Sequence, residues 1–395
     1  MKEYELNSKI FSSSTYEGLC DINGFPIQQY YDFYKDLAVN NVKNIITGFA
    51  FIDVKGRAMH VGQAGIDNDN KIEYYKKLCH IVHEHGSRIY MQIAHTGRQS
   101  RSNITGSRLL SPSSKRSVYF REKPKKLTIQ EIESIVESFG EAALRAKKSG
   151  FDGVQIHGAH GYLIHQFLLE GINDRRDKYG ISKELGLGVK FLDEIIDRIR
   201  EKCGTAYPLL IKISGGVDID DKFTTERFIN LIKYLNSKSL HMIEISYGTM
   251  DFALNIFRGD VPYQLILDKN PLFYSTNPLR IALTKKVIFP WYKNKLKDYS
   301  EAYNLDYAKL AKEHTNTPII SVGGFRTKKT IVDALKNNYC DYVGLCRPFL
   351  AEIDLMNSLN QCQEYTFKCI NCNYCAVMTD TGVASKCYKF TKGVK

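Results

Sequence analysis

The stretch DGVQIHGAHGYLIHQFLLEGINDRRDKYG, residues 152–180, combines a strand pattern with three side chains that can carry chemistry. A strand is expected over its first six residues, and His157, His160 and Tyr162 follow where that strand ends and its loop begins. In a barrel of alternating strands and helices, reactive groups project from this end of a strand. The stretch therefore predicts a barrel strand that opens into an active site.

The types and spacing of these three residues favour a catalytic set. Two imidazoles three residues apart can both hydrogen-bond one oxygen atom, and a nearby phenol can deliver a proton. A single histidine would more often be a buried side chain with its hydrogen bonds satisfied. A pair of histidines with a tyrosine at a strand end does not fit that simpler interpretation.

Short apolar runs alternate with amphipathic segments along the chain, and runs such as LLIKI and PIISV are typical of parallel strands covered on both faces. Strands are predicted at residues 9–14, 44–48, 88–95, 152–157, 209–214, 241–246, 318–322 and 341–346. Helices are predicted at residues 28–40, 71–86, 128–149, 187–202, 224–236, 301–315, 327–336 and 350–361. Thr128 and Glu131 have capping-box spacing at the start of the third helix. Eight strands, each followed by a helix, predict an α/β fold of the (β/α)₈ TIM-barrel type, with a doubly wound sheet as the alternative.

The pattern predicts one barrel over residues 1–363 and a Cys-rich tail over residues 364–395. Two connections are long: residues 96–127 after the third strand, and residues 247–300 after the sixth. In a barrel these are loops of the catalytic face, where insertions shape access of the substrate. A surface elaboration without contact to the substrate is the alternative.

The string HGAHGYLIHQFL and the N-x-R-x-D-x-Y-G pattern after it resemble the signature of the old yellow enzyme family, in particular its short bacterial members and the barrel domain of 2,4-dienoyl-CoA reductases. The pattern is formed by Asn173, Arg175, Asp177, Tyr179 and Gly180. The family has a second glycine where this chain has Ile181. Further motifs resemble the family in the same order along residues 5–360, so the resemblance implies a barrel that binds FMN.

The resemblance also implies which residues contact the flavin ring. KIFSSSTYEGLCDINGFP resembles the segment that runs along the ring, which implies Ser13, Ser14 and Thr15 as contacts. ITG places Gly48 beside the ring edge, and MQIAHTGRQ places Gln92 on its pyrimidine side.

A cation and two loops complete the expected cofactor site. LLIKIS carries Lys212 where many family members have Arg, and a cation there would face N1 and O2 of the flavin and stabilise the charge of the reduced ring. SVGGFR follows the seventh strand and GLCRPFL ends the eighth, the two places where barrels commonly cradle a phosphate. Gly323 and Gly324 allow close approach of the backbone, and Arg347 supplies a bidentate cation. Cys346 stands where the family usually has Gly.

Four cysteines near the C-terminus form a C-x2-C-x2-C-x11-C pattern: Cys369, Cys372, Cys375 and Cys387. Dienoyl-CoA reductases carry a 4Fe-4S cluster on a similar set, with three residues between the second and third Cys instead of two. Four thiolates at this spacing can hold an iron–sulfur cluster or zinc, or can remain reduced thiols. The sequence leaves these alternatives open.

Composition and charge limit the classes of binding partner that the sequence is compatible with. The 395 residues are 43% hydrophobic and 25% charged, which is ordinary for a globular protein. The first ten residues are polar, and no apolar run is long enough to span a membrane. The basic residues behind the net charge of +12 are scattered along helices and gathered in short runs at residues 123–126 and 386–395, without interleaved stacking aromatics. We therefore expect a cytoplasmic protein without a membrane or nucleic-acid partner. A homo-oligomer is compatible with the sequence.

The predicted reaction transfers hydride from NADH or NADPH, through FMN, to the C=C bond of a small-molecule activated alkene, an α,β-unsaturated carbonyl compound. His157 and His160 would bind the carbonyl oxygen, and Tyr162 would protonate the α-carbon. A flavin-dependent amine dehydrogenase is one alternative. An RNA-modifying flavoenzyme is another, but neither its catalytic loop cysteine nor an RNA-binding extension is found in the sequence.

Overall fold

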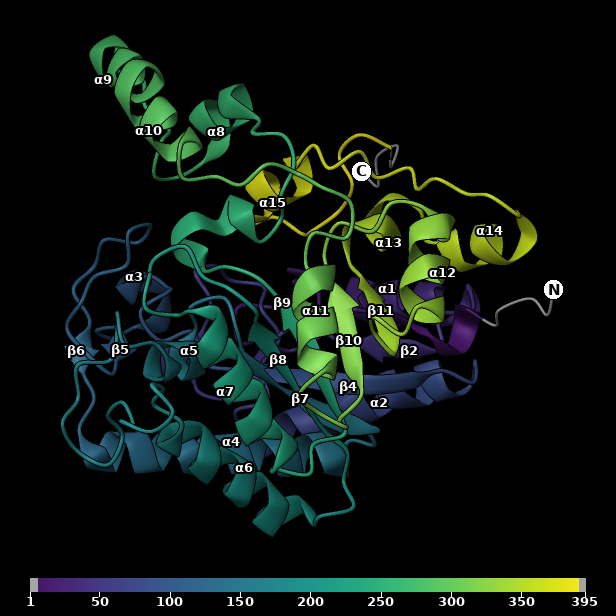
Figure 1. Cartoon of the computed structure of the whole chain (residues 1–395). Coiled ribbons are helices and arrows are strands. Elements are labelled where there is room, and N and C mark those ends of the chain that lie inside the picture. Colours follow the sequence, from purple (N-terminus) through teal and green to yellow (C-terminus); the bar gives the residue numbers. More distant parts are fainter. Residues whose placement is uncertain (1–5, 391–395) are drawn as a thin grey trace.

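The computed structural model describes residues 6–390, in which eight parallel strands form a closed barrel (Figure 1). The strands are β1 Ile10–Ser12, β2 Asn44–Ile46, β4 Arg88–Ala94, β7 Gly153–Gly158, β8 Leu209–Ser214, β9 Met242–Ser246, β10 Ile319–Val322 and β11 Tyr342–Leu345. They neighbour one another in chain order, and the pairing of β1 with both β2 and β11 closes the cylinder. Each strand overlaps its predicted range, so the predicted TIM barrel is confirmed. A short additional strand, β3 Ala50–Phe51, pairs with β4.

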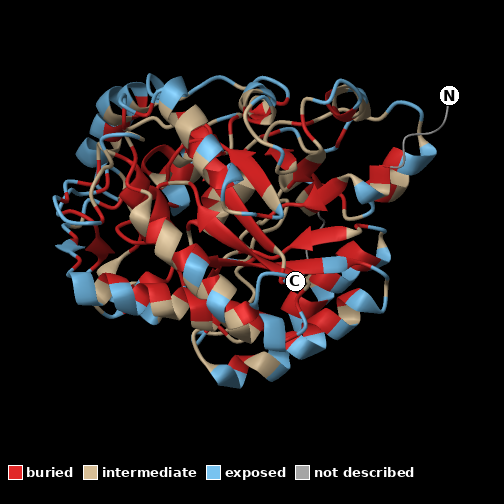
Figure 2. Ribbon diagram, turned by 60° about the horizontal axis from the view of Figure 1, so that its bottom comes forward, coloured by how far each residue is buried: buried red, intermediate tan, exposed pale blue. Residues whose placement is uncertain are grey.

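Amphipathic helices cover the barrel, with their buried faces toward the strands and their exposed faces outward (Figure 2). They are α1 Gln28–Val39, α2 Ile72–His83, α4 Ile129–Lys148, α6 Lys190–Cys203, α7 Thr225–Asn236, α11 Leu305–Lys312, α12 Lys328–Lys336, α13 Arg347–Ala351 and α14 Leu355–Gln361. The predicted capping box is present at α4, where Thr128 Oγ1 accepts the N–H of Glu131 at 3.2 Å and the Glu131 carboxylate accepts the N–H of Thr128 at 2.9 Å. None of the helices within residues 6–390 has the length and apolar character needed to cross a bilayer.

The prediction of one helix over residues 350–361 is wrong, because α13 and α14 are separate helices. The break is at Glu352, whose backbone is extended (φ −153°, ψ 99°). Its buried carboxylate accepts the N–H of Lys368 at 2.7 Å and the hydroxyl of Tyr365 at 2.6 Å. Local periodicity cannot reveal this break, because the groups that hold Glu352 lie after the helix, in the C-terminal segment.

Inside the barrel, the side chains change from apolar to polar toward the carboxyl ends of the strands. An apolar layer is formed by Phe11, Ile46, Tyr90, Leu210 and Ile320. Side chains two residues further along a strand point to the same side. Those positions carry Ser13 after β1, Gln92 in β4 and Lys212 in β8, all of them buried. The strand period alone therefore brings polar groups together at one end of the barrel.

The two long connections contain short elements of their own. The first includes α3 Ser102–Thr105, β5 Leu110–Ser111 and β6 Lys125–Lys126. The second includes α8 Tyr263–Lys269, α9 Pro278–Leu283 and α10 Phe289–Lys293, which stand away from the barrel in Figure 1. A further short helix, α5 Leu163–Leu168, follows β7.

The segment after α14 packs on the barrel. The N–H of Phe367 donates to the carbonyl of Arg326 at 2.8 Å, and the N–H of Ser385 donates to the carbonyl of Glu17 at 2.7 Å. Between these contacts, α15 Tyr374–Thr379 lies beside α8. The Cys-rich segment is thus in contact with the first and last parts of the barrel and with the second long connection.

A buried carboxylate, Glu17, connects the segment after β1 to α1 and to the loop after β2. It accepts the N–H of Gly48 at 2.8 Å and the hydroxyl of Tyr34. Burial raises the pKa of Glu17 to about 7, although these hydrogen bonds act in the opposite direction. The folded protein therefore binds this proton more tightly than the unfolded chain does. The resulting stabilisation is fully present below pH 4.5 and is lost as the pH rises through about 7.

Glu17→Gln, which keeps the shape but cannot ionise, should gain stability relative to the native protein as the pH rises. The difference in free energy of unfolding should move in favour of the variant by on the order of 2 kcal/mol between pH 5 and pH 8. Urea unfolding at both pH values measures it. Glu364→Gln at an exposed position serves as the control, and a pH-independent difference for Glu17→Gln would contradict the assignment.

Candidate active site

A cavity of about 280 Å³ lies at the carboxyl ends of the barrel strands. Its walls include most of the residues that the sequence singled out: Ser14, Thr15, Gln92, His157, His160, Tyr162, Lys212, Gly323, Gly324, Cys346 and Arg347. Ser13 and Gly48 lie behind this wall, since Ser13 bonds to buried charged groups and the Gly48 amide is directed to Glu17. The structure therefore brings together residues from six different strand ends in one chamber.

The floor of the cavity contains a buried ion pair. Lys212 Nζ lies 3.4 Å from Glu244 Oε1 and donates to Ser13 Oγ at 3.2 Å. Both charged side chains are almost fully buried, and such charges are tolerated when they are paired. An ammonium has three N–H donors, so one remains for a group in the cavity. Glu244 was not among the residues predicted from the sequence, although a carboxylate inside the apolar strand MIEIS is a signal that could have revealed it.

Neutral side chains extend this ion pair into a chain across four strands. Gln155 Nε2 donates to Glu244 Oε2 at 2.7 Å, Gln92 Nε2 donates to Gln155 Oε1 at 2.5 Å, and Ser14 Oγ donates to Gln92 Oε1 at 2.8 Å. These contacts orient the Gln92 amide and leave it one N–H and one lone pair for the cavity.

The imidazoles and the phenol meet at the end of β7. His157 Nδ1 accepts the N–H of Ala159 at 3.3 Å, so a neutral ring carries its proton on Nε2 and can donate from there. His160 Nε2 lies 2.8 Å from Ser246 Oγ. The centroids of the two imidazole rings are 5.1 Å apart, and that of Tyr162 lies 4.7 Å from that of His157. Polar groups of all three residues can thus reach one bound molecule.

Burial determines the protonation of these groups. It holds the pKa of His157 and of His160 well below the usual range, and the nearby Lys212 charge acts in the same direction. Both rings are therefore neutral near pH 7. Burial also raises the pKa of Tyr162, so the phenol keeps its proton. Within residues 6–390 the Tyr162 hydroxyl makes no hydrogen bond, which leaves it available to a ligand.

At another part of the cavity, two glycines form a cradle. Gly323 and Gly324 have φ values of +130° and +80°, which side-chain-bearing residues rarely adopt. An added Cβ would lie 2.6 Å from Asn304 Nδ2 at the first position and 2.5 Å from a ring carbon of Tyr303 at the second. Neither glycine amide donates to another group within residues 6–390. Two free N–H groups on half-buried backbone that lines the cavity suit an anion such as a phosphate.

Arg347 lies beside this cradle, at the start of α13. Its Nη1 donates to Asn373 Oδ1 at 2.6 Å and its Nη2 to the carbonyl of Arg258 at 3.3 Å. Both partners lie outside the barrel, one in the C-terminal segment and one in the second long connection. The preceding Cys346 points its thiol toward the carbonyl of Ser13, at 3.7 Å.

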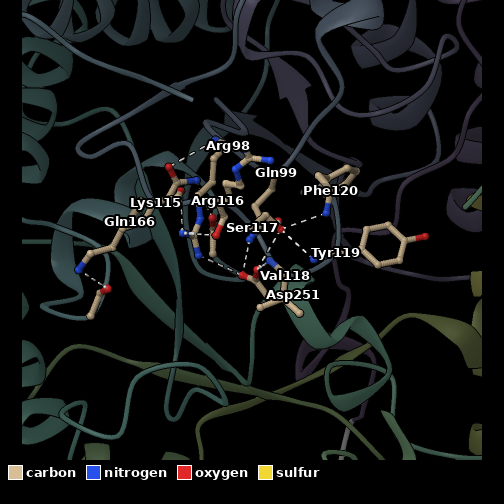
Figure 3. Close-up of polar contacts among 12 residues, drawn as sticks. Arg98, Gln99, Lys115, Arg116, Ser117, Val118, Tyr119, Phe120, Gln166 and Asp251 are labelled. Atoms are coloured by element: carbon tan, nitrogen blue, oxygen red, sulfur yellow. Dashed lines mark hydrogen bonds and ion pairs between the residues drawn. The ribbon is translucent and has the colours of Figure 1, made fainter. Parts of the chain in front are cut away.

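The two long connections are joined by a buried carboxylate, Asp251 (Figure 3). It accepts from Arg98 Nη2 at 3.3 Å, Gln99 Nε2 at 2.6 Å, Ser117 Oγ at 2.9 Å and the N–H of Val118 at 2.6 Å. Gln99 lines the cavity, so this junction fixes part of the cavity wall. Both connections contribute to the chamber.

A second carboxylate, Asp380, brings the C-terminal segment into the same wall. It accepts from the Tyr119 hydroxyl and from Asn270 Nδ2, and His60 Nε2 lies 3.5 Å from its Oδ1. All four residues line the cavity. None of the four was predicted from the sequence, because they come from four distant segments and none belongs to a motif.

The four cysteines of the C-terminal segment line a small separate cavity of about 20 Å³ beside Arg347. Burial raises the pKa of Cys369 above its ordinary value and raises the pKa of Cys375 to about 11. No group of three or more His, Cys, Asp or Glu side chains within residues 6–390 is arranged to hold a metal ion. A space of this size holds about one water molecule, so an iron–sulfur cluster does not fit the arrangement as it stands. The iron–sulfur prediction stays a prediction.

A closed (β/α)₈ barrel with unpaired glycine amides, a buried cation and imidazoles at its strand ends is typical of barrel enzymes that bind a phosphate-bearing cofactor. Residues 1–257 match the NADH:flavin oxidoreductase / NADH oxidase family. The chain belongs to this family and is an oxidoreductase of the old yellow enzyme type. The family implies FMN as cofactor and NAD(P)H as reductant.

Individual relatives agree with this membership. The chain is 29% identical over 357 residues to an NADH oxidase of Thermoanaerobacter brockii. The aligned region covers 90% of this chain and 49% of that protein. It is 33% identical over 250 residues to an NADPH dehydrogenase of Geobacillus sp. (strain WCH70), with 62% of this chain and 70% of that protein covered. The chain therefore spans about half the length of the Thermoanaerobacter relative.

Two solved structures share the fold. Morphinone reductase superposes with a TM-score of 0.68 at 21% identity, over 89% of this chain and 85% of that one. A 2-naphthoyl-CoA reductase in complex with 2-naphthoyl-CoA superposes with a TM-score of 0.72 at 21% identity, over 91% of this chain and 51% of that one. At these identities the likeness shows the fold alone.

The cradle glycines provide a direct test of cofactor binding. Gly324→Ala should weaken FMN binding by about tenfold or more, because the added Cβ meets Tyr303 and displaces a free amide. Titration of FMN fluorescence with the apoprotein measures the affinity. Gly106→Ala is a matched control, since Gly106 also has a left-handed φ (+65°) but an added Cβ there meets nothing within 4 Å. Equal affinities of the two variants would contradict an anion cradle at Gly324.

Proposed function

We propose that this chain is an ene-reductase, which uses NADH or NADPH and FMN to reduce the C=C bond of an α,β-unsaturated carbonyl compound. The observation that carries the proposal is the cluster at the end of β7, where the imidazole centroids of His157 and His160 are 5.1 Å apart and the Tyr162 ring lies 4.7 Å from His157, all three lining the cavity. FMN, when bound, supplies the hydride. The residues of the chain must then bind the carbonyl group, stabilise the charge that develops on it, and deliver a proton.

The two imidazoles suit the first two of these tasks. A neutral His157 donates from Nε2, because its Nδ1 is occupied by a backbone N–H. Donors fixed before the reaction stabilise the negative charge that develops on the carbonyl oxygen as the β-carbon is reduced. The left-handed backbone of His160 (φ +59°) and its contact with Ser246 hold the second ring toward the same space.

Tyr162 suits the third task. Its raised pKa keeps the proton on the phenol over the physiological pH range. Its free hydroxyl lies in the cavity beside His157, so a substrate bound through its carbonyl oxygen can present its α-carbon to this proton.

The residues proposed to contact FMN mostly line the cavity. Ser14, Thr15, Gln92 and Lys212 would contact the ring, the last as the cation near N1 and O2. The phosphate would lie on the amides of Gly323 and Gly324, beside Cys346 and Arg347. Ser13 would act through Lys212, to which its hydroxyl is bonded. Gly48 would act through the carbonyl of Thr15, which approaches it too closely for any Cβ.

The rest of the cavity favours an apolar substrate. Its upper wall consists largely of apolar and aromatic side chains of the second long connection, including Met250, Leu254, Phe257, Ile266, Phe289 and Tyr292. Such walls bind by excluding water, whereas a few polar groups fix the orientation. A hydrophobic enone whose carbonyl group reaches the imidazoles matches this distribution.

Tyr162→Phe should slow reoxidation of the reduced enzyme by an enone by about 10²- to 10⁴-fold, because the proton donor is lost. Reduction of the flavin by NAD(P)H needs no such proton and should proceed at the native rate. Anaerobic stopped-flow absorbance separates the two half-reactions.

Tyr90→Phe is the matched control, since Tyr90 lies in the apolar layer at the opposite end of the barrel interior. It should leave both half-reactions unchanged. Unimpaired enone reduction by Tyr162→Phe would remove Tyr162 as the acid. Reduction of the flavin by amines, with no reoxidation by any enone, would instead point to an amine dehydrogenase.

A further inference from the structure

One helical segment carries an exposed apolar face that neither the barrel nor the cavity uses. α9, a π-helical turn at Thr284–Ile288 and α10 follow one another without interruption. Pro290 lacks an N–H, and a widened turn accommodates such an interruption of the hydrogen-bond ladder. Figure 1 shows α9 and α10 at the outermost edge of the molecule, beyond α8.

The exposed face is a stripe of large apolar side chains at four-residue intervals. This apolar stripe consists of Leu279, Leu283, Val287 and Trp291, which are 81%, 55%, 56% and 48% exposed. Residues four apart lie on the same side of a helix, so these side chains form one continuous strip. Scattered exposed apolar residues are normal, but an ordered row on a projecting helix marks a contact surface.

The same segment is strongly basic. Residues 269–297 contain seven Lys and Arg and no Asp or Glu. The basic residues are Lys269, Arg280, Lys285, Lys286, Lys293, Lys295 and Lys297. In the part of the chain that the structure describes, none of them forms an ion pair. Their charge is therefore available to an outside partner.

This combination favours one kind of partner. A second copy of the chain would set seven positive charges against seven, which is repulsive. A neutral apolar surface would leave the cations without counter-charges. An anionic lipid bilayer satisfies both features, because the stripe can enter the acyl boundary while Lys and Arg contact lipid phosphates. Tryptophan is also the side chain that favours the membrane–water boundary.

We propose that residues 278–297 dock on the surface of an anionic lipid bilayer as an interfacial helix. The expectation of no membrane partner rested on the lack of a spanning segment, which a helix lying in the interface does not need. Phe289 and Tyr292 of the same segment line the cavity, so docking would bring the cavity next to the bilayer. The proposal is independent of the reaction assigned above.

Trp291 is the only tryptophan of the chain, so its emission reports on the stripe directly. The holoenzyme should co-sediment with vesicles of phosphatidylcholine and phosphatidylglycerol and show a blue shift of Trp291 emission. Vesicles of phosphatidylcholine alone should bind it much more weakly. Lys285→Gln/Lys286→Gln should weaken binding about 30-fold, at roughly fivefold for each lysine near the surface. Leu283→Ser/Val287→Ser should weaken it about tenfold or more and reduce the blue shift.

Matched controls change the same residue types elsewhere. Lys183→Gln/Lys233→Gln removes two exposed lysines from the barrel surface, and Ile22→Ser changes an apolar side chain that is 65% exposed. Both should bind vesicles like the native protein, and retained FMN absorbance verifies that each variant is folded. The proposal is overturned if the native protein ignores anionic vesicles, or if the control lysine pair weakens binding equally. It is also overturned if Trp291 emission is already blue-shifted in a lipid-free dimer, which would mean that a second copy covers the stripe.

Discussion

The buried contact between Lys212 and Glu244 is the constraint on which the cavity depends. Two opposite charges so far from water persist only when each neutralises the other and hydrogen bonds satisfy what remains. Ser13 and Gln155 supply those bonds, and Gln92 extends them to the first strand end. Because these groups come from different strands, the floor keeps its geometry only if the barrel closes in one register. The closed sheet and the polar chain therefore stabilise one another.

In the walls of the cavity, two other buried carboxylates likewise accept hydrogen bonds from several segments of the chain. Asp251 accepts hydrogen bonds from the first long connection, and Asp380 accepts them from two segments that are far apart in sequence, with His60 of a third segment 3.5 Å away. Arg347 is held by Asn373 and by a carbonyl of the second connection. The C-terminal segment is therefore a structural part of the chamber. A substitution in the C-terminal segment would therefore alter the cavity, although that segment follows the last barrel helix.

The cavity lining around the imidazoles and the exposed face of the projecting helical segment differ in their charge. Beside the Lys212–Glu244 ion pair, burial keeps His157, His160 and the Tyr162 phenol neutral, which suits chemistry that depends on fixed donors and one retained proton. On the projecting helical segment, seven basic residues remain in water beside an exposed apolar row. Positive charge also gathers elsewhere, since residues 98–126 carry nine Lys and Arg and one Glu; what distinguishes the projecting segment is the apolar row beside its cations.

The sequence by itself determined the barrel, the order of its strands and the group at the end of β7. Those features follow from local rules: apolar runs specify buried strands, the two-residue period places Gln92 and Lys212 on the inner side, and His157 follows its strand directly. Only the tertiary structure decided the break at Glu352, the pairing of Glu244 with Lys212, and the contribution of Asp380 to the wall. Each of these depends on partners on other elements, from 13 residues away for Glu352 to 261 residues away for Asp380. Periodicity and motif spacing describe residues that are close together in the sequence. The position of a buried charge depends instead on the side chains of other strands that the closed barrel places beside it.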